Sequence, residues 1–210
     1  RNVCMKFAFC IGNGESRKGF NINSLRKYGT IYGANALFRD LKKPVDHLVC
    51  CDRTMAMEAV AAKYDGRVYT RKDWIFTFPY ENYNVLPDVP WEESEKYKES
   101  FHMGSGLHAV NLAVHNDEDI LVCIGHDFWN YNDKHNNLYK GSVNYPIPKL
   151  LVSPHFWIQQ FELFFKLYPK KQFVFAQPNA KRWPKPKGWN KYTNVNVENL
   201  GSLLNALDKS

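Results

Sequence analysis

A short apolar run that ends in a glycine turn constrains the fold of this chain most. Five apolar residues, from Phe7 to Ile11, are followed by Gly12-Asn13-Gly14. The run predicts a buried strand, because its length suits a strand and because glycines adopt backbone conformations closed to other residues. Residues 21–28 predict a short helix with an Asn or Ser near its start.

A strand, a Gly-x-Gly turn and a helix N-terminus leave backbone N–H groups that suit a phosphate or another anion. The turn is therefore a candidate nucleotide site. Its spacing, Gly-x-Gly-x-x-Arg, lacks the third glycine of the dinucleotide fingerprint, so a Rossmann dehydrogenase is not indicated. A tight turn without a ligand is the alternative.

Further apolar runs alternate with helical patterns along the chain. Strands are expected at 29–36, 45–52, 68–70, 119–124 and 172–176, and helices at 53–64, 105–114, 154–168 and 198–207. Strands separated by helices pair in parallel through right-handed crossovers. The sequence therefore predicts an α/β fold: one Rossmann-like domain over residues 1–210, with a mostly parallel sheet flanked by helices.

Three segments break this alternation. Residues 74–100 form an aromatic insertion, interpreted as a lid, an acceptor-side insertion or a satellite hydrophobic cluster. Residues 129–150 predict a long lid-like loop. Residues 180–192 alternate basic and aromatic residues, and Lys181, Arg182, Lys185 and Lys187 there are candidate nucleic-acid contacts. The alternative for this last segment is a surface loop whose tryptophans pack back on the body.

Composition limits the partners and the compartment. The chain carries 28 Lys and Arg against 21 Asp and Glu, a net charge of +7, which favours anionic partners such as nucleic acid, phosphates or acidic glycans. No run approaches the roughly 20 apolar residues that cross a bilayer. The five cysteines have no metal-knuckle spacing, so buried free thiols in a reducing cytosol are expected. These features predict a cytoplasmic protein.

Five motifs in order resemble the bacterial lipooligosaccharide sialyltransferases. They are Ile11-Gly12-Asn13-Gly14-Glu15-Ser16-Arg17, Tyr32-Gly33-Ala34-Asn35-Ala36-Leu37-Phe38, Ser105-Gly106 before a helix, Ile124-Gly125-His126-Asp127-Phe128-Trp129 after a strand, and His155 opening a helix; Ala176-Gln177-Pro178-Asn179 then follows the next strand. The resemblance spans about residues 5 to 180. Glu15 stands where the family has proline, and Trp129 where it has one of its tyrosines.

This resemblance implies a GT-A-like, metal-independent, inverting glycosyltransferase that uses a CMP-sugar-like donor. It implies that Asn13, Asn35, Ser105 and Gly106 line the donor site, and that His155 is the general base that takes the proton of the acceptor hydroxyl. In that family, tyrosine hydroxyls stabilise the leaving phosphate. To these residues we add our own candidates: Gly12, Gly14, Ser16, Arg17 and Trp129 at the donor, Asp127 to orient the loop over it, and Tyr131 or Tyr139, which no motif match fixes, for the leaving phosphate.

Three functions stay open from the sequence. The first is the glycosyltransferase acting on a glycan, with a nucleotide-sugar as its donor substrate and no metal cofactor. The second follows from a similarity of the Asn-Asn-Leu-Tyr-Lys-Gly stretch to bacteriophage proteins, and is a transferase that modifies DNA bases in the host cytoplasm. The third is a non-catalytic nucleic-acid-binding protein on the same scaffold.

Overall fold

The computed structural model describes residues 5–90, 103–128, 136–147, 152–178 and 184–209. Its centre is one sheet of eight strands, all paired in parallel, in the order β5-β4-β3-β2-β1-β6-β7-β8. The strands are β1 (Phe7–Ile11), β2 (Thr30–Ala34), β3 (His47–Val49), β4 (Val68–Thr70), β5 (Tyr83–Val85), β6 (Ile120–Ile124), β7 (Gln172–Gln177) and β8 (Val195–Asn199). The predicted α/β class with a parallel sheet is confirmed.

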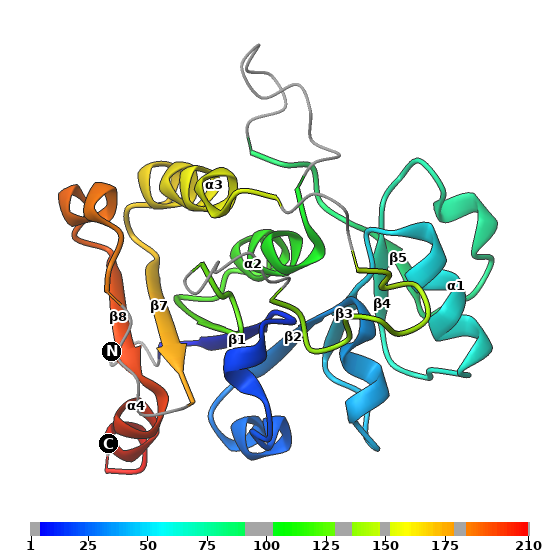
Figure 1. Ribbon diagram of the computed structural model, residues 1–210, viewed down its shortest axis with the longest axis horizontal. Helices are drawn as coiled ribbons and strands as arrows, with labels where there is room; N and C mark the ends of the chain where they lie inside the picture. The colour runs from blue at the N-terminus through cyan, green and yellow to red at the C-terminus, as the bar shows by residue number, and fades with distance from the viewer. Residues whose placement is uncertain (1–4, 91–102, 129–135, 148–151, 179–183, 210) are drawn as a thin grey trace.

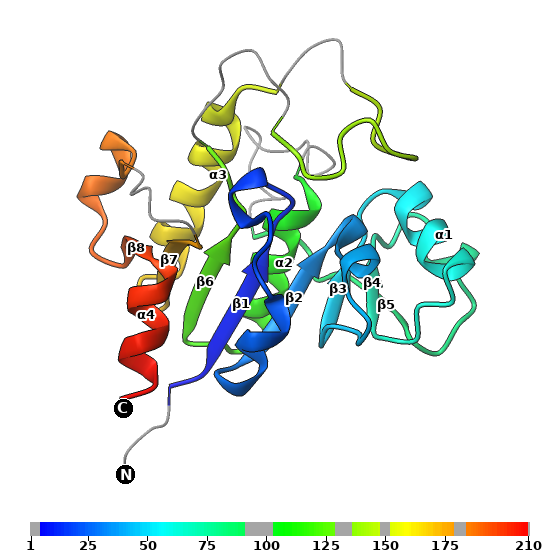
Figure 2. The same ribbon diagram turned by 60° about the horizontal axis from the view of Figure 1, so that its bottom comes forward.

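Helices and 3-10 turns cover both faces of the sheet (Figures 1 and 2). The α-helices are α1 (Arg53–Ala61), α2 (Ser105–His115), α3 (Pro154–Leu167) and α4 (Leu200–Leu207). The 3-10 turns are η1 (Glu15–Arg17), η2 (Ile22–Lys27), η3 (Asn35–Asp40), η4 (Ile75–Thr77) and η7 (Lys187–Lys191). Within the described ranges, no helix is long and apolar enough to cross a membrane.

The strand order reverses direction at β1. Strands β2 to β5 follow one another on one side of β1. After β5 the chain passes through α2 and continues with β6 on the other side of β1. Cys10 of β1 lies in register with Tyr32 of β2 and with Cys123 of β6. In parallel α/β sheets such a reversal opens a crevice at the carboxyl ends of the two strands, where ligands bind.

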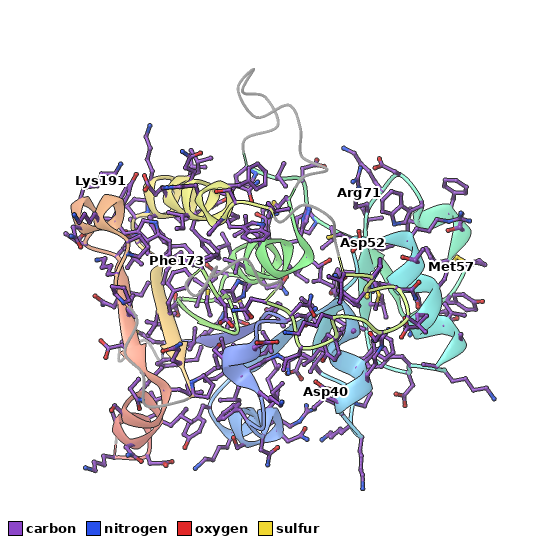
Figure 3. The ribbon with its side chains drawn as sticks, viewed as in Figure 1. Asp40, Asp52, Met57, Arg71, Phe173 and Lys191 are labelled. Atoms are coloured by element: carbon purple, nitrogen blue, oxygen red, sulfur yellow. The ribbon has the colours of Figure 1, made fainter. Side chains whose placement is uncertain are left out.

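Two apolar clusters fill the faces of the sheet. One holds the buried side of α2 together with aromatic residues of α3 and β7, among them Phe161, Phe165 and Phe173 (Figure 3). The other lies under α1, α4, η2 and η3, and contains Phe9, Ile11 and Leu200. Because successive strand residues point to opposite faces, β1 contributes Ala8 and Cys10 to the first cluster and Phe9 and Ile11 to the second.

Some predicted elements differ in type or extent. The helix expected at 21–28 is the 3-10 turn η2, capped by the Asn21 side chain, which accepts from the Asn23 N–H. β5 lies inside the segment that was predicted to be irregular. The sequence pattern missed this strand because it has only three residues and lies among prolines and aromatic residues. The last helix begins at Leu200, since residues 195–199 pair with β7 as an edge strand.

The described cysteines are buried and unpaired, as expected. Cys10, Cys50, Cys51 and Cys123 are free thiols inside the two clusters. Burial raises the pKa of the Cys51 thiol to about 12. It also raises the pKa of the Cys10, Cys50 and Cys123 thiols. Cys4 lies outside the described residues.

The basic aromatic segment packs back on the body where it is described. Trp189 is fully buried, with its ring centroid 4.7 Å from that of Phe175 and 5.0 Å from that of Phe165. Its indole N–H donates to the Ile158 carbonyl at 3.3 Å. A residue in this position cannot stack on a nucleic-acid base. Lys181 and Arg182 lie outside the described residues.

Replacing Trp189 by Ala should lower the free energy of unfolding by about 3–5 kcal/mol, because the substitution leaves a large cavity among aromatic rings. Urea denaturation of both proteins measures the difference. Lys187→Ala, two residues away on the surface, is the matched control and should change stability by less than about 0.5 kcal/mol. Equal stabilities of the two variants would contradict the buried position of Trp189.

Candidate functional site

A cavity of about 270 Å³ lies beyond the carboxyl ends of β1, β2 and β6, at the reversal of strand order. Its walls come from six parts of the chain, and the lining residues are Gly12, Asn13, Gly14, Ala34, Asn35, Gly104, Gly106, Leu107, Gly125, His126, Asp127, Phe128, Asn136, Asn137, Tyr145, Trp157 and Phe161. This place is where open α/β sheets bind ligands. We call it the switch-point cavity.

The turns after β1 and β6 touch each other through glycines. The N–H groups of Gly12 and Gly14 donate to the carbonyls of Ile124 and Gly125, both at 2.8 Å. A Cβ on Gly12 would stand 2.5 Å from the Gly125 oxygen, and one on Gly14 would stand 2.6 Å from it. Gly125 itself has φ of 71°, a value that favours glycine. Only glycine fits at these three positions.

The expectation that the first turn leaves its N–H groups free for an anion is wrong. Besides Gly12 and Gly14, the Glu15 N–H donates to the Asn136 side chain at 2.8 Å. The Ser16 N–H and hydroxyl donate to the Asp127 carboxylate at 2.9 and 2.5 Å. The carboxylate thus occupies the place predicted for a phosphate. Burial raises the pKa of Asp127, and the bonds from Ser16 oppose that shift.

Arg17 stabilises this turn through a hydrogen bond to its backbone and does not line the cavity. It is buried, and its guanidinium donates to the Gly12 carbonyl at 2.7 Å and to the Tyr139 hydroxyl at 2.8 Å. It also pairs with Asp40 at 3.2 Å. The Tyr139 hydroxyl donates to the same Asp40 carboxylate. A buried cation needs such partners, so Arg17 and Tyr139 are structural here.

The N-terminus of α2 opens into the switch-point cavity. Gly104 precedes the helix, and no side chain caps it. The N–H groups of Ser105 and Gly106 have no acceptor among the described residues. The helix dipole adds partial positive charge at this end. The Gly104-Ser105-Gly106 turn therefore offers the free N–H groups that the turn after β1 was expected to offer.

Asn35 joins four parts of the site. Its side-chain oxygen accepts from the Ser105 hydroxyl at 2.6 Å, and that hydroxyl accepts from the Cys51 N–H at 3.0 Å. Its amide also reaches Asp52 at 3.4 Å, and its side chain bonds with Tyr145. Asn35 has φ of 48°, uncommon for a residue with a side chain. Such strain is retained where the surroundings fix it, often at binding sites.

His126 lines the cavity with a buried side chain. Its side chain is 8% exposed, and its Nε2 has no hydrogen-bond partner among the described residues. The ring bonds to the backbone of Cys10, while burial lowers its pKa to about 4. A neutral imidazole that donates through one nitrogen accepts through the other. His126 can therefore accept a hydrogen bond from a ligand hydroxyl or N–H.

The described part of the predicted lid-like loop, residues 136–147, forms a wall of the cavity. It contributes Asn136, Asn137 and Tyr145, and the Asn13 amide donates to the Tyr145 hydroxyl at 3.2 Å. Arg39 anchors the segment, because its guanidinium donates to Ser142 and to the Val143 carbonyl, each at 2.8 Å.

Arg39 also binds both oxygens of Glu58, at 2.6 and 2.7 Å. This bidentate pair lowers the pKa of Glu58. The Asn144 amide donates to the same carboxylate at 2.6 Å. The wall is thereby fixed to α1 and η3.

The predicted site residues divide into three groups. Gly12, Asn13, Gly14, Asn35, Gly106 and Asp127 line the cavity, whereas Ser16, Arg17, Ser105 and Tyr139 support it from behind. His155 does not line it; it is exposed in the first turn of α3, two residues before Trp157, which does. Trp129 and Tyr131 lie outside the described residues.

Several lining residues escaped the sequence analysis. His126 follows a strand and a glycine, which is a detectable signal for a site. Trp157 lies among apolar residues of its helix, a pattern that also indicates a core position. Tyr145 carries no local signal. Over the described ranges, no group of three His, Cys, Asp or Glu side chains is arranged to hold a metal ion.

The buried neutral His126 predicts an acid-sensitive fold. The unfolded state takes up a proton below about pH 6.5 and the folded state only below about pH 4, so stability falls as the pH drops through that window. The loss is on the order of 3 kcal/mol. Urea denaturation at several pH values should show a shallower decline for His126→Asn than for the wild-type chain. Parallel curves would show that His126 titrates normally.

No protein-family model, no curated protein and no solved structure matches this chain. The likeness to the sialyltransferases therefore rests on its sequence motifs, and the chemistry of the switch-point cavity has to be argued from its geometry.

Proposed function

We propose that the chain is a glycosyltransferase that binds a nucleotide-sugar in the switch-point cavity and transfers the sugar to an acceptor hydroxyl. The observation that carries the proposal is the uncapped N-terminus of α2 opening into a cavity at the reversal of strand order. The unpartnered Nε2 of His126 in the same cavity supports it, because a buried polar atom without a partner points to a ligand.

The phosphate of the donor is assigned to α2 and not to the first glycine turn. At α2 it accepts from the N–H groups of Ser105 and Gly106 and interacts favourably with the helix dipole. At the first turn it would meet the Asp127 carboxylate, and the N–H groups of Gly12, Gly14 and Ser16 there already have acceptors. Like charges at short distance oppose binding.

The remaining walls suit a nucleoside. Trp157 and Phe161 supply apolar surface, while Asn13 and Asn137 supply amide donors and acceptors for a base or a ribose. The Nε2 of neutral His126 accepts from a hydroxyl. The volume of about 270 Å³ is near the lower end of small-molecule sites, as expected for a nucleotide whose sugar extends toward the opening.

His155 is proposed as the general base. An acceptor oxygen attacks the anomeric carbon, the bond from that carbon to the phosphate oxygen breaks, and its electron pair leaves on the phosphate. The acceptor proton passes to His155, and a single displacement inverts the anomeric centre. His155 is exposed at the start of α3, where an acceptor arriving from solvent can reach it. The N-terminus of α2 stabilises the negative charge of the donor phosphate, so the proposed mechanism requires no metal.

The acceptor is a glycan or a modified DNA base, both of which offer hydroxyls. The basic segment gives DNA limited support: Trp189 is buried, Lys185 donates to the Val195 carbonyl at 2.7 Å, and Lys191 pairs with Glu162 at 3.0 Å. The non-catalytic nucleic-acid-binding alternative has no observation that favours it beyond the net charge of +7.

We expect the melting temperature of the chain to rise with the nucleotides of one base when CMP, UMP, CDP, UDP and GDP are tested separately. A ligand at about 100 times its Kd adds roughly 2.7 kcal/mol to folded-state stability. Gly106→Ala should weaken that ligand about tenfold or more, since the new Cβ lies 3.1 Å from His126 Cε1 at the anion site.

Gly201→Ala is the matched control, because Gly201 is likewise the second residue of its helix and its Cβ would also meet a neighbour at 3.1 Å. It should leave nucleotide binding unchanged. Absence of stabilisation by every nucleotide would refute the donor site.

His155→Ala should slow release of the nucleotide from the preferred nucleotide-sugar by about 10²–10⁴-fold while leaving nucleotide affinity unchanged, as expected for loss of a general base. Release is measured with a mixture of sugar acceptors and with water alone. His115→Ala, another exposed histidine at the end of α2, is the control and should match the wild type. Full activity of His155→Ala would remove His155 from the mechanism.

A further inference from the structure

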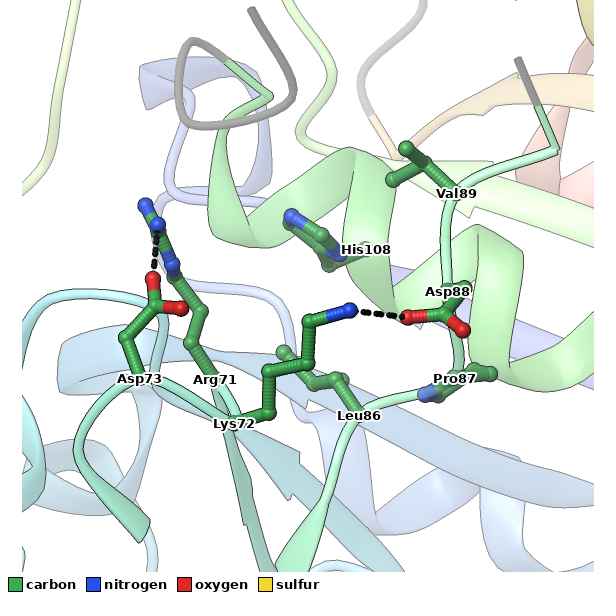
Figure 4. A pocket seen from close by; sticks show the side chains of 8 residues that line it. All are labelled: Arg71, Lys72, Asp73, Leu86, Pro87, Asp88, Val89 and His108. Atoms are coloured by element: carbon green, nitrogen blue, oxygen red, sulfur yellow. Dashed lines mark hydrogen bonds and ion pairs between the residues drawn. The ribbon is translucent and has the colours of Figure 1, made fainter. Parts of the chain in front are cut away.

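A second cavity, of about 60 Å³, lies beside the first turns of α2, on the side of β4 and β5 (Figure 4). The residues after β4, Arg71 to Asp73, form one wall, and the residues after β5, Leu86 to Val89, form the other. His108 of α2 closes it. We call it the His108 cavity.

Among the described residues, none forms a hydrogen bond with the His108 ring. It is 5% exposed, and neither ring nitrogen has a hydrogen-bond partner among the described residues. A buried histidine that only fills space normally bonds through at least one nitrogen. Burial and the nearby Arg71 charge lower its pKa to about 4, so the ring is neutral near pH 7 and offers one donor and one acceptor.

The charges at the His108 cavity cancel. Figure 4 shows Arg71 paired with Asp73 on one side of the His108 ring and Lys72 paired with Asp88 on the other. An anion would meet two carboxylates and a cation would meet two basic groups. The lining therefore favours a neutral ligand over an ion of either sign.

Hydroxyl groups match this lining. A hydroxyl donates and accepts at once, as a neutral imidazole does. Lys72 and Asp88 form an ion pair at 3.0 Å, and their side chains are 63% and 70% exposed. Such an exposed pair contributes little free energy, so either group can bind a ligand in place of its partner at little cost. Leu86, Pro87 and Val89 add an apolar wall for C–H groups. The volume admits about four water-sized groups, which is an edge of a sugar ring and not a whole one.

The two cavities share the start of α2. Gly104 and Leu107 line the switch-point cavity, and His108 lines the second one. One helical turn advances about 5.4 Å, so the two sites are neighbours along the same edge of the sheet. A molecule held at His108 lies beside the assigned donor position.

We propose that the His108 cavity is a subsite for the hydroxyl-bearing edge of a neutral sugar, which belongs to the acceptor. The role of this sugar as the acceptor rests on the proposed transferase function, whereas the binding of a sugar at His108 does not.

Ring nitrogens of His108, assigned in 15N- and 13C-labelled full chain, report binding directly. The probes are methyl glycosides of glucose, galactose and N-acetylglucosamine, and inorganic phosphate as the anion. We expect at least one glycoside to shift the His108 signals, and phosphate not to. Asp88→Asn should raise the Kd of that glycoside about tenfold, the loss expected for one hydrogen bond to a charged group.

Asp208→Asn is the control, because it alters another exposed pair, Lys27 with Asp208, and should leave the Kd unchanged. Shifts by phosphate alone would replace the sugar subsite with an anion site, and no shift with any probe would mean that the cavity holds only water. Either result overturns the inference. Nucleotide stabilisation without a His108 response refutes this subsite alone, while a His108 response without nucleotide stabilisation refutes the transferase alone.

Discussion

Contact between two glycine turns sets the geometry of this molecule. Gly12 and Gly14 after β1 and Gly125 after β6 lie so close that their N–H and carbonyl groups bond directly, and any side chain at these positions would collide with backbone. The contact fastens the two strands between which the order of the sheet reverses. The floor of the switch-point cavity is therefore backbone, and the nearby side chains are placed relative to it.

The glycine turn after β1 and the one at the start of α2 differ in their free N–H groups. The turn after β1 uses the N–H groups of Gly12, Gly14 and Ser16 in hydrogen bonds within the fold, and the Asp127 carboxylate and the Arg17 guanidinium hold it in place. At the start of α2, the N–H groups of Ser105 and Gly106 have no acceptor among the described residues. A buried carboxylate and a phosphate compete for the same N–H donors. The turn that already binds the Asp127 carboxylate is therefore poorly suited to bind a second anion. Asn35 links the second turn to β2 and to the wall of residues 136–147.

The sequence predicted the features that depend on local pattern. Apolar runs within the predicted strands at 7–11, 119–124 and 172–176 identified the central strands, because strands buried on both faces are continuously apolar. It missed β5 and β8, whose three and five residues mix polar and apolar side chains as edge strands do. The candidate site was predicted in part. Gly12, Asn35 and Gly106 stand at strand and helix ends, whereas the position of Tyr145 and the occupation of the first turn by Asp127 depend on contacts between residues more than a hundred positions apart.

The strand order also determines how long β1 stays incomplete while the chain is synthesised. Its β2 neighbour is complete by Ala34, but its other neighbour begins at Ile120. At the usual rate of translation, β1 keeps one edge unpaired for on the order of ten seconds after the first pairing becomes available. For most of that interval, until α2 has been synthesised, its Ala8 and Cys10 face also lacks that helix. The arrangement that places a cavity at the centre of the folded sheet thus gives the nascent protein an open sheet edge, the feature that molecular chaperones and unwanted strand pairing both exploit.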